Sequence, residues 1–152
     1  MSEPELSKST KATPQQVWAV LEDGYRYPEW VKGTKEIRDV EAGWPAPGTS
    51  LHYTAGIGPL VKKDRTTSRE MVRDRYLELE AVAWPFGSAR IALTLDPEDG
   101  GTTVRMQEHP LRGIGRVVHT TLTKVGFALR IRVMLDDLVR LAEAEPSPPS
   151  PR

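Results

Sequence analysis

The chain has 152 residues, enough for one domain with a sizeable core. Lys plus Arg and Asp plus Glu both number 21, so the formal net charge is +0 and no overall charge favours nucleic acid or anionic lipid as a partner. Cysteine is absent, which excludes disulfides and thiolate metal sites and fits a cytoplasmic protein. No apolar run approaches the roughly 20 residues that span a bilayer, so we expect no membrane insertion.

The N-terminal region predicts a short helix over residues 14–23. Thr13 is a good N-cap, Pro14 suits the first helical position, and Gln16 completes a capping box with Thr13. Gly24 suits the left-handed position that ends a helix. The helix should therefore stop after about two turns and give way to a second short helix or turn.

That second element should cover residues 25–32 and end at Gly33. From Gly48 to Pro110 the hydrophobic period changes from helical to two, which is typical of antiparallel strands. The clearest predicted strands are 50–57, 60–73, 75–84, 87–96 and 101–109, and two weaker ones, 5–11 and 34–41, flank the short helices. The segment DPEDGG predicts a hairpin between the last two strands.

A long helical segment is expected at about 113–144. Its apolar positions are Leu122, Val125, Leu129, Met134, Leu138 and Leu141. Only this helix is large enough to cover the apolar face of the sheet, so a curved seven-stranded antiparallel sheet should wrap around it and leave a cavity between them. This is an α+β arrangement in one domain, residues 1–144, and the Pro/Ser-rich residues 145–152 should be a disordered tail.

Three stretches carry a resemblance to a known family: TPQQVWAVLEDGYRYPEWVKG, the strand region TTSREMVRDRYLELEAVAWPFGSARIALTLDPEDGGTTVRMQEHP, and LDDLVRLAEAE. With them the chain resembles the START/Bet v 1-like (SRPBCC) superfamily, in the polyketide cyclase/dehydrase branch, over residues 4–144. The resemblance implies a helix-grip fold in which two short helices after the first strand seal one end of the sheet. The aromatic residues Tyr25, Tyr27 and Trp30 should fill that wedge.

Strand alternation gives candidate inward faces. Glu108 shares a face with Val104 and Met106, and Leu93 lies on the inward face of the preceding strand. A carboxylate inside the cavity would have a raised pKa and would serve as a general acid or base or bind a ligand hydroxyl. The alternative is that Glu108 lies at the strand end and meets solvent or a surface arginine.

The strand VKKDRTTSREMVRD carries charges on both faces. If Met71 pairs with Leu77, Arg69 shares the inner face and becomes a partner for Glu108 or for an acidic ligand. The alternative is a bulge or an overhanging hairpin that keeps these charges solvated. Both interpretations remain open from the sequence.

Further ligand-binding candidates come from loops and from the long helix. Trp84 and Phe86 stand in a tight apolar turn that either gates the cavity or caps the core. His119 is a candidate acid or base at the pocket mouth, against a plain surface or packing role. Val125 and Leu129 complete the candidate lining. The three histidines lack partners at ligand spacing, so no metal and no cofactor is expected.

The resemblance implies a small hydrophobic ligand, polyketide- or lipid-like, bound between the sheet and the long helix. Cyclases of this type work by proximity and acid/base catalysis, and here Glu108 and Arg69 would be the acid/base and anion-orienting groups. The rival is a non-catalytic carrier or partner-binding module whose cavity is filled by its own side chains. Turnover and a homodimer are left open, and nucleic acid is not expected as a partner.

Overall fold

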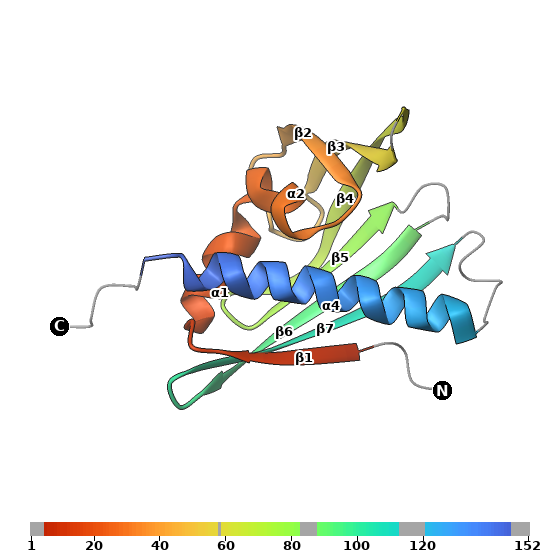
Figure 1. Cartoon of the computed structure of the whole chain (residues 1–152). Helices are drawn as coiled ribbons and strands as arrows, with labels where there is room; N and C mark the ends of the chain where they lie inside the picture. The colour runs from red at the N-terminus through yellow and green to blue at the C-terminus, as the bar shows by residue number, and fades with distance from the viewer. Residues whose placement is uncertain (1–4, 58, 83–87, 113–120, 147–152) are drawn as a thin grey trace.

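A computed structural model of the chain describes residues 5–57, 59–82, 88–112 and 121–146. The elements are β1 (Glu5–Thr10), α1 (Pro14–Glu22), the 3-10 helix η1 (Gly24–Arg26), α2 (Tyr27–Trp30), β2 (Thr34–Val40), β3 (Ser50–Ile57), β4 (Leu60–Val72), β5 (Tyr76–Val82), β6 (Ser88–Glu98), β7 (Gly101–Arg112) and α4 (Thr121–Glu143), as Figure 1 shows. This order confirms the predicted α+β helix-grip fold.

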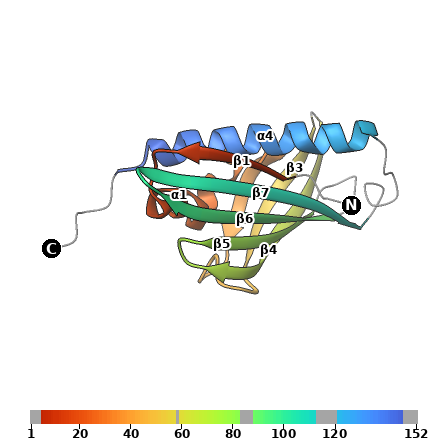
Figure 2. The ribbon, with the colours of Figure 1, turned by 90° about the horizontal axis from the view of Figure 1, so that it is seen from below.

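The described strands form one antiparallel sheet in the order β1-β7-β6-β5-β4-β3-β2. Each strand from β2 to β7 pairs with its neighbour in sequence, and β1 closes against β7. Figure 2 shows α4 running along one side of this sheet, next to β1. The sheet therefore wraps around the C-terminal helix, as predicted from the single apolar face of the sheet.

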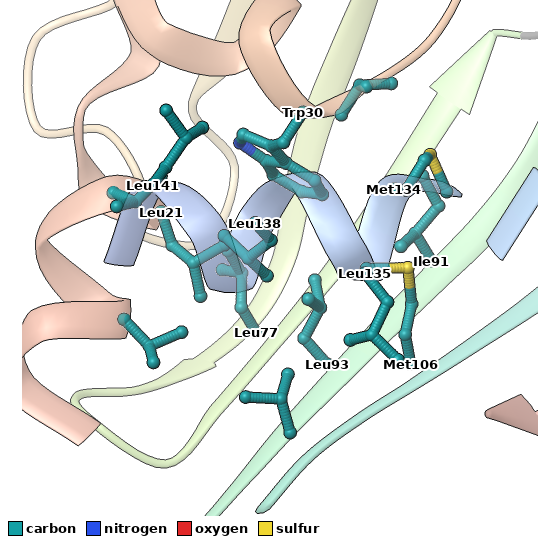
Figure 3. Packing of buried hydrophobic residues seen from close by; sticks show 14 of the residues in the cluster. Leu21, Trp30, Leu77, Ile91, Leu93, Met106, Met134, Leu135, Leu138 and Leu141 are labelled. Carbon is teal, nitrogen blue, oxygen red and sulfur yellow. The ribbon is translucent and has the colours of Figure 1, made fainter. Parts of the chain in front are cut away.

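The core lies between α4 and the inner face of the sheet (Figure 3). Its largest contributions from α4 are the buried side chains of Ile131, Met134, Leu135 and Leu138. They face a matching set of buried strand residues, Leu77, Leu79, Ile91, Leu93 and Met106. The spacing of three and four residues on α4 keeps one stripe of the helix against the sheet.

The helix phase corrects one sequence-based prediction. Leu129 was placed among the inward apolar positions, but its side chain is 62% exposed. It precedes Ile131 by two residues, which is about 200° around an α-helix, so burial of Ile131 turns Leu129 outward. The side chains of Leu122 and Val125 lie outside the described residues.

The start of α1 is the predicted capping box. The Gln16 backbone N–H donates to Thr13 Oγ1 at 3.1 Å, and the Thr13 backbone N–H donates to Gln16 Oε1 at 2.8 Å. Gly24, however, does not adopt the left-handed conformation predicted for it. A Cβ there would lie 2.5 Å from Leu51 Cδ2 and 3.0 Å from both Val40 methyl groups. Gly24 is therefore required for close packing of the turn on the sheet.

The aromatic wedge is formed by two residues, not three. Tyr27 and Trp30 are buried, with ring centroids 5.5 Å apart in an edge-to-face arrangement. Tyr25 is 65% exposed, which contradicts its predicted place in the wedge. A 3-10 turn repeats every three residues, so Gly24 and Tyr27 share its inward side and Tyr25 points away.

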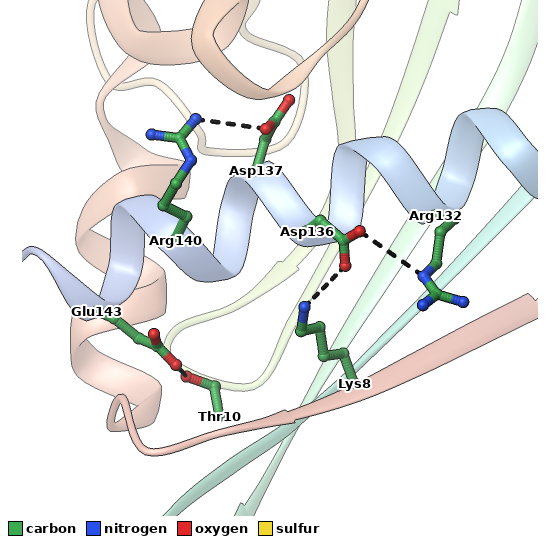
Figure 4. Close-up of polar contacts among 7 residues, drawn as sticks. All are labelled: Lys8, Thr10, Arg132, Asp136, Asp137, Arg140 and Glu143. Carbon is green, nitrogen blue, oxygen red and sulfur yellow. Dashed lines mark hydrogen bonds and ion pairs between the residues drawn. The ribbon is translucent and has the colours of Figure 1, made fainter.

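Polar contacts hold the outer side of α4 against the N-terminal part of the chain (Figure 4). Lys8 Nζ on β1 lies 2.8 Å from Asp136 Oδ1, and Thr10 Oγ1 donates to Glu143 Oε2 at 2.6 Å. Beyond the helix, Gln16 Nε2 donates to the Glu145 carbonyl oxygen at 2.7 Å. These contacts fix the position of α4 along the sheet. No helix in the described ranges is long and apolar enough to cross a membrane.

Candidate functional site

Glu108 is the one carboxylate among the described residues that is almost completely buried, with 1% of its surface exposed. It follows Val104 and Met106 on the inner face of β7, and all three are buried. Across the ladder it pairs with Ile91 of β6, which is also buried. Strand alternation therefore carries the carboxylate into an otherwise apolar region beneath α4.

The partner of Glu108 is Arg130 of α4. Arg130 Nε lies 3.3 Å from Glu108 Oε1 and donates a long hydrogen bond of 3.4 Å to Oε2. Arg130 Nη1 donates to the Lys32 carbonyl oxygen at 2.9 Å, which joins α4 to the segment after α2. Glu108 Oε1 accepts no hydrogen bond from any described residue. The carboxylate is thus buried with an incomplete set of donors.

Burial raises the pKa of Glu108, and the nearby Arg130 guanidinium opposes that rise. The direction follows from desolvation, which disfavours the charged form more than one loosely placed arginine favours it. A carboxyl group with a raised pKa exchanges its proton closer to neutral pH than an exposed glutamate does. This is the property that general acid/base chemistry requires.

The raised pKa predicts a pH dependence of stability. Between the ordinary value of 4.5 and the pKa in the folded chain, the folded state holds the Glu108 proton more tightly than the unfolded chain. The free energy of unfolding should therefore fall as pH rises through this window, by at most about 1.4 kcal/mol per pH unit. Glu108→Gln does not titrate, so its stability relative to the parent should increase with pH and then level off.

Urea unfolding of both proteins between pH 4 and pH 8 measures this difference, because titration of all other groups is common to the two chains. A difference that decreases with rising pH would mean that the attraction of Arg130 outweighs desolvation and lowers the pKa of Glu108.

Arg69 does not contact Glu108, which corrects the predicted pairing. Met71 does pair with Leu77, as expected, but the register shifts between Ser68 and Glu70. This bulge inserts one residue and reverses the alternation, so Ser68 faces inward and Arg69 outward. Arg69 is 51% exposed and pairs with Glu80, its Nη2 lying 2.9 Å from Oε1.

Before the bulge, the inward-facing side chains of β4 are polar. Thr66 is completely buried, and its Oγ1 lies 2.8 Å from the Tyr27 hydroxyl and 2.9 Å from the Tyr53 hydroxyl. The two tyrosine rings are stacked, with centroids 5.6 Å apart. We call Tyr27, Tyr53 and Thr66 the hydroxyl cluster. Its two hydrogen bonds connect α2, β3 and β4 through one buried oxygen atom, Thr66 Oγ1.

Two alanines lie between the hydroxyl cluster and β7. Thr66 pairs with Ala81 of β5, and Ala81 pairs with Ala89 of β6. Both alanines are buried, and Ala89 is two residues from Ile91, the partner of Glu108. Elsewhere the inner faces of β5 and β6 carry leucine and isoleucine. The concave face therefore has two of its smallest side chains between Glu108 and the hydroxyl cluster.

Metal coordination finds no support in the described part of the chain, where no group of three or more His, Asp or Glu side chains converges. His52 Nε2 instead lies 2.6 Å from Glu41 Oε2 near the surface. The polar groups that do converge are the Glu108–Arg130 pair and the hydroxyl cluster.

The family of the chain follows from its sequence match over nearly the whole fold. A family model described as "Polyketide cyclase / dehydrase and lipid transport" matches residues 3–143. The chain belongs to this family. The resemblance noted from the sequence is therefore confirmed. No curated protein has a significantly similar sequence.

Several solved structures share the polyketide cyclase/dehydrase fold of this chain. A protein of unknown function, SA2116 from Staphylococcus aureus, superposes with a TM-score of 0.70 at 17% identity, covering 93% of each chain. Ara h 8.0201 has a TM-score of 0.70 at 12% identity, covering 93% of this chain and 97% of that one. DynU16, from the dynemicin biosynthetic locus, has a TM-score of 0.64 at 15% identity, covering 92% of this chain and 46% of its own. At these identities the likeness shows the fold.

Of the other lining candidates for this family member, Met106 and Leu93 are buried on the inner face of the sheet, and Leu129 is exposed on the outside of α4. Trp84, Phe86 and His119 lie outside the described residues, as does the side chain of Val125. Sequence reasoning missed three site components, Arg130, Thr66 and Tyr53. Arg130 directly precedes a buried position of α4, so its place beside Glu108 can be recognised only when the phase of the helix is known.

Proposed function

We propose that this protein binds a small, predominantly hydrophobic molecule between the inner face of the sheet and α4, with Glu108 as its polar anchor. The observation that carries the proposal is Glu108 Oε1, a buried carboxylate oxygen without a hydrogen bond from any described residue. An unsatisfied buried polar atom costs about 1–3 kcal/mol, more when charged. A ligand hydroxyl that donates to Oε1 would remove this cost.

The surroundings of Glu108 support a mainly apolar ligand. Ile91, Met106, Ala81 and Ala89 give apolar walls, and the two alanines occupy little of the space beneath α4. The description of the family, polyketide cyclase/dehydrase and lipid transport, agrees with a polyketide- or lipid-like molecule. Burial of such a molecule is favoured by about 25 cal/mol for each Å² of apolar surface removed from water.

Acid/base chemistry at Glu108 is the catalytic extension of this proposal. The raised pKa lets Glu108 exchange a proton with a bound ligand, and Arg130 takes the anion-orienting role predicted for Arg69. With a substrate that turns over, Glu108→Gln should lower kcat by about 10²–10⁴ and leave affinity nearly unchanged. Steady-state kinetics checks this, with exposed Glu36→Gln as the matched control. Unchanged kcat would mean that Glu108 is not the acid/base group.

Ligand binding itself is tested by filling the space beside Ala89. Ala89→Leu should weaken binding of 2-naphthol at least tenfold, because the larger side chain occupies the proposed site. Overpacking costs typically 1–3 kcal/mol, so a cooperative thermal transition should remain. Titrations that follow the probe's fluorescence measure the affinity.

Leu129→Ala, on the outside of α4, is the control and should bind 2-naphthol like the parent. If Ala89→Leu binds as well as the parent, the ligand does not lie on this face of the sheet. If the parent binds neither 2-naphthol nor any small molecule that co-purifies in native mass spectrometry, the interior is filled by its own side chains. The partner-binding module would then be the better interpretation.

A further inference from the structure

We infer that the hydroxyl cluster of Tyr27, Tyr53 and Thr66 is a second polar subsite, which donates one O–H hydrogen to a carbonyl-type oxygen of the ligand whose hydroxyl group binds Glu108. The inference rests on the proposed function and specifies the class of ligand. The molecule carries a hydrogen-bond donor at one end of an apolar body and an acceptor at the other.

The hydroxyl cluster has more O–H hydrogens than hydrogen bonds. Each of the three side chains has one O–H hydrogen, so the cluster holds three donors. It contains two hydrogen bonds, Tyr27 to Thr66 and Tyr53 to Thr66, and in each either oxygen is able to donate. Two bonds use two hydrogens. One hydroxyl hydrogen is therefore left over, whichever way the bonds are directed.

The spare hydrogen belongs to one of the three hydroxyl groups. If both tyrosines donate to Thr66, the threonine hydrogen is free, and if Thr66 donates to one tyrosine, the hydrogen of that tyrosine is free. Within the described residues, none of the three side chains has another acceptor.

The cluster is a neutral donor and not an anion. Burial raises the pKa of Tyr27 well above its ordinary value and raises that of Tyr53 to about 12. All three hydroxyl groups therefore keep their hydrogens at neutral pH. A spare donor deep in the protein is unfavourable, and a ligand carbonyl oxygen would satisfy it.

The two subsites are placed for one ligand. Thr66 is on β4 and Glu108 on β7, three strand spacings apart across the sheet and offset by two residues along it, or about 16 Å between backbones. Both side chains point inward from a curved sheet, so the gap between them is shorter than this backbone distance. Ala81 and Ala89 lie between the subsites. An apolar body over these alanines reaches the acceptor and the donor together.

Four probes with the same ring system separate the contributions of the hydroxyl and acetyl groups to the binding affinity. They are naphthalene, 2-naphthol, 2-acetylnaphthalene and 6-acetyl-2-naphthol. Their dissociation constants are measured by fluorescence titration or calorimetry with the full chain. The variants are Tyr27→Phe and the triple variant Tyr27→Phe/Tyr53→Phe/Thr66→Val, which removes every hydroxyl group of the cluster and with them the spare hydrogen. Tyr25→Phe, at an exposed tyrosine two residues away, is the matched control.

The acetyl group should improve affinity about 2- to 10-fold over the same probe without it, which is the usual range for one neutral hydrogen bond. This gain should persist in Tyr25→Phe and vanish in the triple variant, and the naphthol hydroxyl should keep its own gain. An infrared spectrum of 2-acetylnaphthalene bound to the parent provides a measurement that needs no variant. Its C=O stretch should lie at lower wavenumber than in a hydrocarbon solvent.

A gain that survives the triple variant, or an unshifted C=O stretch in the bound probe, would overturn the inference and leave the proposed function standing. In that case the spare hydrogen is satisfied by water. Failure of all four probes, naphthalene included, to bind the parent would overturn the proposed function and the inference with it.

Discussion

Deletion of residues 113–152 should leave a chain with no cooperative thermal transition. The segment contains α4, whose described side chains include seven buried apolar ones in the core: Ile131, Met134, Leu135, Leu138, Val139, Leu141 and Ala142. Without them the inner face of the sheet, including Leu77, Leu93 and Met106, would be exposed to water. The short helices α1 and α2 cover only one end of this face, so the remaining chain cannot bury the rest of it.

Calorimetry or circular dichroism during heating measures the transition. Deletion of residues 147–152 alone is the control and should melt as the parent does. A sharp transition near the parent temperature after the longer deletion would show that the sheet and the short helices fold by themselves. The helix-grip description of the energetics would then be wrong.

Leu138→Ala should lower the free energy of unfolding by about 2–5 kcal/mol, the usual cost of removing a large buried aliphatic side chain. Leu138 has 0% of its surface exposed and lies against the sheet in Figure 3. Leu129→Ala is the matched control, because it makes the same chemical change on the same helix. At an exposed position the effect should stay within about 0.5 kcal/mol.

Chemical denaturation at one pH, with equal slopes for the three proteins, checks the pair. Equal midpoints for Leu138→Ala and the parent would place Leu138 outside the core. A large loss for Leu129→Ala would mean that its exposed position is covered in solution, for example by a second copy of the chain.

These stability predictions and the proposed function refer to different parts of α4. From Ile131 onward, the side chains that face the sheet are apolar and buried. Arg130, one residue earlier, brings a charge to the same side and meets Glu108. Residues after this point hold the fold together, whereas Glu108 and the hydroxyl cluster keep polar groups inside at a cost in stability. Such a cost is characteristic of sites retained for binding or chemistry.

Local sequence was sufficient for the elements and for their order. The capping box at Thr13 and Gln16 depends on residues three apart, and the strand alternation of β6 and β7 depends on a period of two. Both patterns are independent of distant contacts. The same alternation correctly put Glu108 with Val104 and Met106, on a face that proved to be buried.

Only the tertiary structure decided which side chains meet. One extra residue in β4 between Ser68 and Glu70 reversed the face of Arg69, because an alternating pattern changes sides at every inserted residue. In α4 the sheet selected the stripe through Ile131 and Leu138, and this turned Leu129 outward and Arg130 toward Glu108. Helix and strand propensities and hydrophobic periodicity depend on nearby residues, so they do not predict which distant side chains meet. Those contacts are decided by the packing of segments that are far apart in the chain.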